Sequence, residues 1–436
     1  MEAASVPLAS SFDGLPLPQR YWAVLTCALA VGMTVVDGTI ATIALPTIAR
    51  DVGASPAASI WVVNAYQLAL VISLLPLSSL GDIIGYPKIY KAGFALFTVA
   101  SLCCALSNSL VTLTLARFVQ GLGAAGIVSV NTALIRTIYP ARMLGRGMGV
   151  NAMVVAVSAA VAPTLAAGIL SVARWPWLFA VNVPVGIVAL AVSMRTLPRI
   201  GGSGHRFDWA AALLSAITFG LLISGIDGLG HGQAAWAAAI EVAVALLVGV
   251  ALVRRQLSQP APLFAVDLLR RPTFALSIAT SACSFSAQML AYVSLPFYMQ
   301  DVLGRSQVQS GLLITPWPLA TLIAAPIAGH LADRYSAGIL GGLGLGTFTA
   351  GLASLALLSP HPDTVSIIWR VALCGLGFGF FQAPNNREII SSAPKDRTGG
   401  ASGMLGMARL TGQTVGAVLV ALIFSMFSHA GNTVAL

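Results

Sequence analysis

Long apolar runs separated by short polar segments make up most of the chain after residue 20. A helix that crosses a bilayer needs about 20 mostly apolar residues. Gly and Pro inside the runs are compatible with such helices, because neighbouring helices satisfy the freed backbone groups. The pattern predicts about thirteen membrane-spanning helices, at 21–45, 58–80, 92–108, 110–135, 147–171, 177–196, 208–228, 235–253, 273–297, 308–331, 338–358, 365–388 and 400–428.

Composition supports the same class of protein. Hydrophobic residues make up 57% of the chain and charged residues only 8%, whereas soluble proteins carry about 25% charged residues. The net charge of +9 is spread between the apolar runs and forms no block that would favour nucleic acid. No pair of the five cysteines has the spacing of a metal site, so neither metals nor disulfides are expected.

Basic residues set the expected orientation. When the N-terminal tail, 1–20, is placed in the cytoplasm, most of the 23 Lys and Arg residues fall on the cytoplasmic side. Cytoplasmic loops of membrane proteins carry this excess of positive charge. We therefore expect a multi-pass protein of a bacterial-type inner (plasma) membrane with its N-terminus in the cytoplasm and the lipid bilayer as its surroundings.

The chain contains an internal repeat. Three landmarks return in the same order about 250 residues later: 45–52 at 295–302, 80–82 at 331–333, and Arg117 at Arg370. Repeated halves are the architecture of secondary transporters, which bind substrate between the halves near the middle of the membrane.

The repeat divides the chain into segments. Residues 21–200 form a first six-helix half, 201–258 an inserted two-helix hairpin, and 259–436 a second half in which five spans are visible. A counterpart of the sixth span is missing from the pattern. Either the last helix is absent from this chain or one span is miscounted. As counted, the C-terminus lies on the periplasmic side.

Several motifs are similar to those of one transporter family. They are Val36–Ile40 in the first span, Leu80–Lys88 after the second, Arg117–Gly126 in the fourth, Ala160–Gly168 in the fifth, and Gly329–Arg334 as a second copy of the loop motif. Together they resemble the major facilitator superfamily, specifically its fourteen-helix drug:proton antiporter branch. Two departures stand out: Tyr86 and Pro87 replace arginines, and Ala162 replaces a glycine before Pro163.

The resemblance implies an all-α major facilitator fold with two six-helix halves. It also implies proton-coupled efflux of lipophilic or cationic small molecules by alternating access, as in exporters of drugs, quaternary ammonium compounds and methyl viologen. The proton gradient would supply the energy and protons would be the second partner, with no cofactor. We expect a monomer.

Asp37 is the leading candidate for this chemistry. An ionised carboxylate at membrane depth must line a cavity, pair with a cation or take up a proton, so Asp37 is expected to hold a proton or a cationic compound. The alternative is an aspartate that caps a backbone kink beside Gly38. Arg117 either tunes this acid or locks backbone carbonyls in place, and Arg409 in the last span is expected to line the cavity.

The family's loop motif implies a cytoplasmic gate. An acid at a helix end can cap the N-terminus of a facing helix and hold that side closed; the alternative is an aspartate in solvent. The expected gate residues are Gly81, Asp82, Gly85, Lys88, Gly329, Asp333 and Arg334.

Two further groups complete the candidate sites. Ala162, Pro163 and Gly168 form an antiporter-like motif in the fifth span. Tyr66, Gln288 and Tyr292 are candidates for a substrate cavity, because aromatic faces attract organic cations. The repeat partner of Asp37 falls at Ala287 or Gln288, so the carboxylate is not duplicated.

Other functions stay open. A dedicated exporter of one metabolite, a proton-coupled nutrient importer, or an inactive truncated transporter would fit the same scaffold. The sequence shows no nucleophile and base pair, phosphate loop or metal set, so we do not expect an enzyme.

Overall fold

The structure is a computed structural model. It describes residues 14–54, 56–59, 61–198, 207–230, 235–257, 266–305, 307–359, 362–394 and 397–430. Regular elements in these ranges are all helical. The predicted all-α fold is therefore confirmed.

Eight α-helices and one short 3-10 helix form the N-terminal half. In chain order they are α1 (Gln19–Asp51), α2 (Pro56–Ser59), α3 (Trp61–Ile84), α4 (Tyr86–Ala105), α5 (Leu110–Ile138), η1 (Ala141–Met143), α6 (Leu144–Val172), α7 (Pro176–Ala180) and α8 (Asn182–Thr196).

The hairpin and the C-terminal half follow. The hairpin consists of α9 (Trp209–Gly230) and α10 (Ala235–Leu257). The C-terminal half contains η2 (Val266–Arg270), α11 (Pro272–Phe297), η3 (Tyr298–Val302), α12 (Gln307–Ile314), α13 (Pro316–Ala332), α14 (Ala337–Ala356), α15 (Thr364–Ser392) and α16 (Thr398–Ala430).

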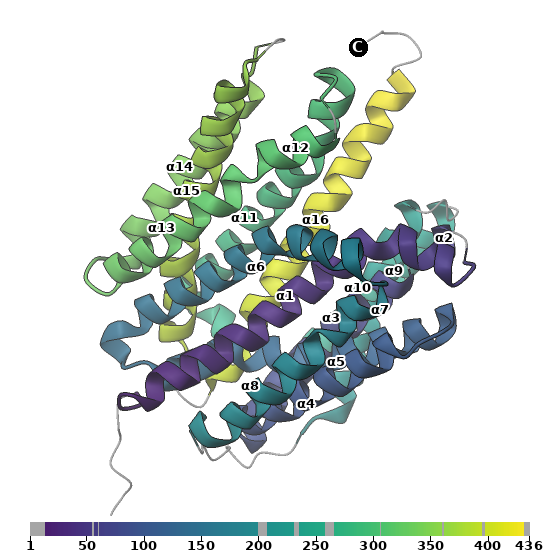
Figure 1. Ribbon diagram of the computed structural model, residues 1–436. Helices are drawn as coiled ribbons and strands as arrows, with labels where there is room; N and C mark the ends of the chain where they lie inside the picture. Colours follow the sequence, from purple (N-terminus) through teal and green to yellow (C-terminus); the bar gives the residue numbers. More distant parts are fainter. Residues whose placement is uncertain are drawn as a thin grey trace, which may run out of the picture.

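Each predicted span corresponds to a helix or a broken pair of helices. The span at 177–196 is interrupted between α7 and α8, and the span at 308–331 between α12 and α13. Within the described residues, eleven helices are long and apolar enough to cross a membrane. Figure 1 shows α1 starting at one end of the bundle and α16 finishing at the other.

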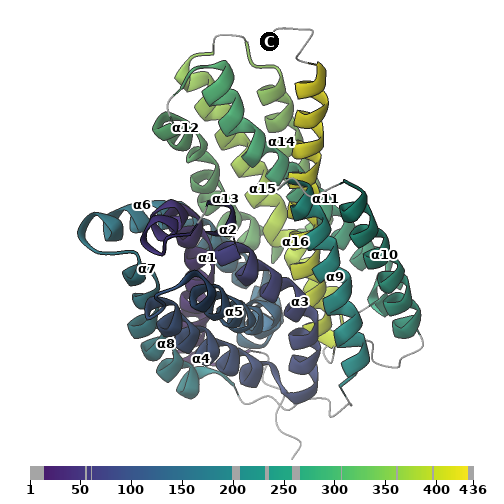
Figure 2. The ribbon, with the colours of Figure 1, turned by 90° about the vertical axis from the view of Figure 1, so that its right-hand side faces the viewer.

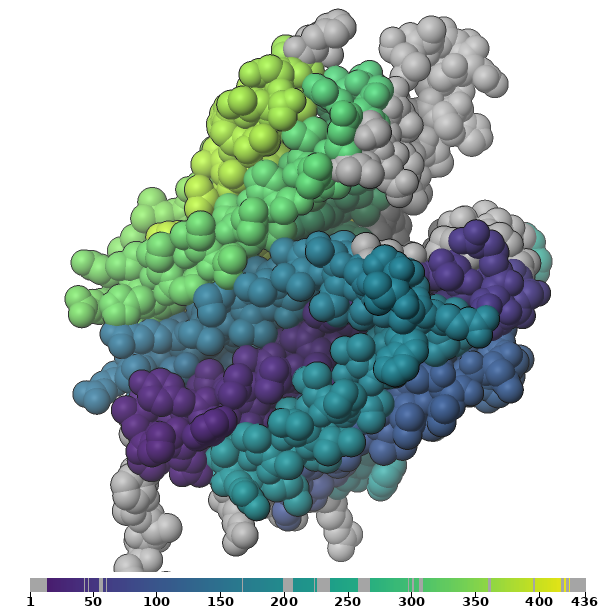
Figure 3. Space-filling view, in the orientation of Figure 1, coloured from purple at the N-terminus to yellow at the C-terminus, as the bar shows by residue number. Residues whose placement is uncertain are grey.

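The two halves meet mainly through α6 with α13 and α3 with α16. Figure 3 shows the green surface of α13 lying along the blue surface of α6. Helices α3 and α13 finish at the same end of the bundle at which α6 and α16 begin. We call this end the basic end. It is the end that the sequence places in the cytoplasm.

Small residues allow this close contact at the basic end. A side chain added at Gly145 of α6 would overlap the carbonyl oxygen of Gly329 on α13. Farther along α6 the helices of the two halves diverge, since Figures 1 and 2 both show α12 and α16 extending away from α2 and α7. Val161, Leu165 and Val172 of α6 are 45%, 38% and 86% exposed there. The halves are thus closed together at the basic end and apart at the other.

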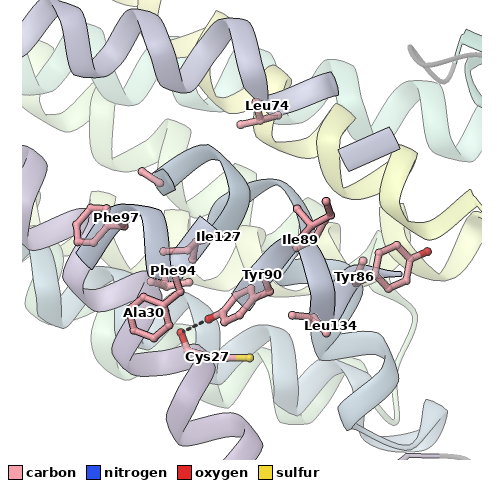
Figure 4. Packing of buried hydrophobic residues seen from close by; sticks show 14 of the residues in the cluster. Cys27, Ala30, Leu74, Tyr86, Ile89, Tyr90, Phe94, Phe97, Ile127 and Leu134 are labelled. Atoms are coloured by element: carbon pink, nitrogen blue, oxygen red, sulfur yellow. Dashed lines mark hydrogen bonds between the residues drawn. The ribbon is translucent and has the colours of Figure 1, made fainter. Parts of the chain in front are cut away.

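A cluster of aromatic and aliphatic side chains fills the N-terminal half. Tyr90, Phe94 and Phe97 of α4 are fully buried in it, and Figure 4 shows them between α1 and α5. The Tyr90 hydroxyl donates to the Cys27 carbonyl oxygen at 3.5 Å. This bond satisfies the one polar group that the Tyr90 ring brings into the core.

The repeat is visible in the packing, with one correction to the sequence alignment. Gly121 of α5 lies against the backbone of Tyr66, and Gly375 of α15 lies in the same way against Trp317. This pairing makes Val371, rather than Arg370, the structural counterpart of Arg117. Arg370 lies one residue before that position on α15, so its side chain points in a different direction. It contacts Ser366 and stacks over Trp369.

The hairpin lies outside the two halves. Figure 2 shows α9 and α10 beside α3 and α16, and α9 packs on α3. Arg255 at the end of α10 donates to both carboxylate oxygens of Asp208 at 3.0 Å. This bidentate pair ties the two ends of the hairpin together.

Gly375→Ala should destabilise the protein. The added methyl group would overlap the backbone of Trp317, and overpacking of this kind costs about 1–3 kcal/mol. The matched control is Gly342→Ala on α14, where nothing lies within 4 Å. We expect thermal unfolding in detergent to show a lower melting temperature for the first variant and an unchanged or higher one for the second.

Candidate functional site

A buried ion pair joins α1 to α5. Arg117 Nη1 donates to Asp37 Oδ2 at 2.5 Å, and the two side chains are 0% and 1% exposed. Helix α5 places Arg117 on its face toward α1, and α1 places Asp37 opposite. A charge at this depth needs a partner, because isolated ions are expensive to bury.

Two amides complete the bonding of the Asp37 carboxylate. Gln120 Nε2 and Asn182 Nδ2 donate to Asp37 Oδ1 at 2.9 and 2.8 Å. Gln120 also accepts from Arg117 at 2.7 Å and donates to the Ser101 hydroxyl at 2.8 Å. The network therefore links α1, α4, α5 and α8.

Aromatic rings enclose the guanidinium group. Its central carbon lies 4.2 Å from the centre of the Tyr66 ring and 5.5 Å from that of Phe179. Its Nε donates to the Val62 carbonyl oxygen at 3.0 Å, while Nη2 has no hydrogen-bond partner among the described residues. Arg117 therefore contacts both an acid and a backbone carbonyl oxygen, and its tuning of Asp37 stays a prediction.

The enclosure limits what Asp37 can bind. The residue is 2% exposed, and both of its carboxylate oxygens are already hydrogen-bonded. A drug-sized cation has no contact with the carboxylate in this arrangement. The idea of Asp37 as a kink cap at Gly38 receives no support from these bonds.

Sequence reasoning missed Gln120 and Asn182 as members of this site. Gln120 follows Arg117 by three residues, so it lies on the same face of α5. Asn182 lies within an apolar span, where a polar side chain needs a partner. Both features of the sequence indicate a buried polar contact, but neither identifies Asp37 as the partner.

At the basic end, Asp82 caps the start of α16. Its two carboxylate oxygens accept from the backbone N–H groups of Gly399 and Gly400, each at 2.9 Å. The Tyr86 hydroxyl donates to the same carboxylate at 2.8 Å. The first N–H groups of a helix have no partner within the helix, so an acid there is both hydrogen-bonded and favoured by the helix dipole.

Asp333 of the C-terminal half makes the equivalent contact with a helix of the N-terminal half. It accepts from the backbone N–H groups of Gly145 and Arg146 at the start of α6, at 2.7 and 3.3 Å. The side chains of Arg146 and Arg387 lie 3.6 and 3.8 Å from its oxygens. Each half thus supplies one aspartate that caps a helix of the other half.

The other residues of the loop motifs have simpler surroundings. Gly81 is buried, Gly85 has a φ of 101° that favours glycine, and Gly329 lies against Gly145. Lys88 and Arg334 are exposed.

The remaining candidates do not gather around Asp37, apart from Tyr66. Ala162 is buried within the N-terminal half, whereas Pro163 and Gly168 are exposed on α6. Tyr292 packs on Trp317, with ring centres 4.9 Å apart. Gln288 is half-buried on α11.

Arg409 of α16 lies apart from this network. Its guanidinium carbon is 5.6 Å from the centre of the Phe285 ring. Within the described ranges it forms no ion pair with an acid. It is therefore a fixed positive charge on a helix of the interface between the halves.

Residues 27–417 match the Major Facilitator Superfamily. The chain belongs to this superfamily. It is therefore a multi-pass membrane transporter, and the predicted fold with its repeated halves is confirmed.

Individual relatives differ in what their names describe. The chain is 60% identical to YebQ of Escherichia coli K12, named only as an uncharacterized transporter, over 97% of this chain and 93% of the relative. It is 27% identical to the riboflavin transporter RibZ of Clostridioides difficile, over 94% and 89%. It is 29% identical to the multidrug resistance protein Stp of Mycobacterium tuberculosis, over 93% and 76%.

A solved structure shares the fold. The human organic anion transporter MFSD10 superposes with a TM-score of 0.65 over 94% of both chains, at 15% identity. At this identity the similarity concerns the fold and not the substrate.

Neutralising both gate aspartates should open the basic end. In Asp82→Asn with Asp333→Asn, charge-assisted hydrogen bonds worth about 1.5–3 kcal/mol are weakened, so the open fraction should rise about tenfold or more. We would measure maleimide labelling of a cysteine placed at Ser402, which is 2% exposed, after replacing exposed Cys103 and Cys283 by serine.

Asp363→Asn is the control for this experiment, because Asp363 is exposed at the start of α15, away from the basic end. Equal labelling of the double variant and this control would show that the two aspartates do not hold the basic end closed.

Proposed function

We propose that this protein exports lipophilic or cationic small molecules in exchange for protons, as in the fourteen-helix drug:proton antiporter branch. The buried Asp37–Arg117 pair carries the proposal, because it places an acid that can exchange a proton at membrane depth. The similarity to a multidrug resistance protein supports the substrate class.

Alternating access accounts for the arrangement of the halves. They are joined at the basic end by Asp82, which caps α16, and by Asp333, which caps α6, and their helices diverge toward the other end. With the N-terminus in the cytoplasm of a bacterial inner membrane, this arrangement faces outward. Breaking the two caps and closing the outer end would give the inward-facing state.

Protonation of Asp37 is the step that we assign to coupling. An added proton removes the negative charge that pairs with Arg117, and breaking a buried pair costs about 3–5 kcal/mol. The Asp37 oxygens hold side chains of α5 and α8. Protonation therefore weakens the bonds among three helices of one half and favours their rearrangement.

Substrate would bind between the halves rather than at Asp37 itself. The carboxylate is enclosed by Tyr66, Phe179 and its hydrogen-bond donors. Proton and substrate then compete through the position of α1 and α5. Such indirect exchange requires only that each ligand binds the two conformations with different affinity.

Asp37→Asn should abolish transport driven by a pH gradient. The variant cannot exchange a proton at position 37. We expect at least a tenfold slower accumulation of ethidium by everted vesicles with an acidic interior, while ethidium movement down its own gradient continues. Proton-driven accumulation at the rate of the parent protein would contradict the role of Asp37.

Two control variants distinguish a loss of proton coupling from a loss of folding in this experiment. Asp37→Asn leaves Arg117 as an unpaired buried charge, so the double variant Asp37→Asn with Arg117→Gln removes both charges. It should also lack proton-driven accumulation while recovering folded protein. Asp363→Asn, an exposed change, should behave as the parent does.

A second candidate function is export of one metabolite that carries an anionic group. Arg409 favours it, because this cation forms no ion pair within the described ranges and lies over Phe285. An arginine without an acid partner attracts carboxylates and phosphates, and one relative is named a riboflavin transporter.

Arg409→Gln separates the two candidates. If the substrate is anionic, its transport should fall about tenfold or more, since charge-assisted hydrogen bonds contribute about 1.5–3 kcal/mol. If the substrate is cationic, ethidium transport should be retained or improved. The comparison needs a panel of anionic dyes beside ethidium in the same vesicles.

A further inference from the structure

The amides of Gln120 and Asn182 meet the same oxygen of Asp37. Gln120 Nε2 and Asn182 Nδ2 donate to Asp37 Oδ1 at 2.9 and 2.8 Å. The other oxygen, Oδ2, accepts from Arg117, whose guanidinium stays charged. A proton taken up by Asp37 therefore belongs on Oδ1, because a proton on Oδ2 would face an N–H group of this cation.

A proton on Oδ1 changes what this oxygen needs from its neighbours. An ionised carboxylate only accepts hydrogen bonds, whereas a protonated carboxyl group also donates one through its O–H. Both amides present N–H groups to Oδ1, and a buried O–H without an acceptor is costly. An amide that turns its carbonyl oxygen toward Asp37 would supply the acceptor.

Gln120 is not free to turn, because both ends of its amide are held. Its Oε1 accepts from Arg117 Nη1 at 2.7 Å and from the Cys104 thiol at 3.5 Å. Its Nε2 also donates to the Ser101 hydroxyl at 2.8 Å. A rotated Gln120 amide would place its N–H groups against the N–H groups of the guanidinium.

Asn182 is held at one end only. Its Nδ2 donates to Asp37, while its Oδ1 forms no hydrogen bond within the part of the chain that the structure describes. The residue is the first of α8 and is 7% exposed. A half-turn of the amide exchanges its oxygen and its nitrogen, which are nearly equal in size, so the rotation needs no additional space.

We propose that Asn182 is a positioning residue that binds Asp37 in both of its protonation states. Its N–H group holds the carboxylate, and after a half-turn its carbonyl oxygen accepts from the Asp37 O–H. This role rests on the proposed protonation of Asp37. It adds the group that receives the hydrogen bond of the new proton.

The exchange weakens one helix contact more than the other. Protonation removes the charge that pairs with Arg117, whereas the hydrogen bond between Asp37 and Asn182 persists with its direction reversed. Charge-assisted hydrogen bonds are about twice as strong as neutral ones. Helix α1 therefore stays joined to α8 and is released mainly from α5.

The titratable side chains that face Asp37 from other helices are Arg117 of α5, Tyr66 of α3 and Cys104 of α4. Helices α2, α6, α7 and α8 also pack on α1, and their sequences contain no acid, histidine, cysteine or tyrosine. Asp37 is therefore the carboxyl group of this network, so its infrared band can be assigned by substitution.

Infrared difference spectroscopy between acidic and alkaline pH tests the proposal on the purified protein. The C=O stretching band of protonated Asp37 is the one that Asp37→Asn removes. Asn182→Leu keeps the size of the side chain and removes the acceptor, so the band should move to higher wavenumber. Proton-driven ethidium accumulation should fall about fivefold, as expected for one lost hydrogen bond.

Asn131→Leu is the matched control, because Asn131 is another buried asparagine of the same half that donates one side-chain hydrogen bond, to Asn151 at 2.8 Å. It should leave the Asp37 band in place. An unshifted band in Asn182→Leu would overturn the proposal even if transport slows, because lost packing alone can slow transport. An equal shift in both variants would also overturn it.

The same spectra separate this proposal from the proposed function. If the parent protein shows no band that Asp37→Asn removes, Asp37 takes up no proton, and the proposed proton step fails together with the role of Asn182. If the band is present but does not respond to Asn182→Leu, only the role of Asn182 fails.

Discussion

The Asp37 carboxylate cannot be placed inside the membrane without compensation, and much of the N-terminal half is organised by that constraint. Arg117 supplies the opposite charge, and two amides satisfy the remaining oxygen. Because the donors come from α5 and α8, the bonding fixes both helices against α1. This one carboxylate therefore holds three helices together.

A second set of acids acts between the halves rather than within one. Asp82 and Asp333 bind backbone N–H groups at the starts of α16 and α6. Water can hydrogen-bond both partners of such a contact when they separate. The buried pair inside one half and the caps between halves thus suit a transporter whose halves move as bodies around a stable interior.

The two halves share a fold but differ in their interiors. Where the N-terminal half has Asp37, Arg117 and Gln120, the C-terminal half has Ala287, Val371 and Cys374. A buried polar network in one half and an apolar interior in the other follow from these substitutions. Coupling chemistry is therefore expected in one half only.

The sequence by itself determined the membrane-spanning helices, the repeated halves, the inserted hairpin and Asp37 as an unusual acid. Those features depend on local composition and spacing, which are readable along the chain. Only the tertiary structure decided the partners of Asp37, which lie 80, 83 and 145 residues away in the chain. It also moved the counterpart of Arg117 from Arg370 to Val371, because a one-residue shift in helix alignment turns a side chain by about 100°.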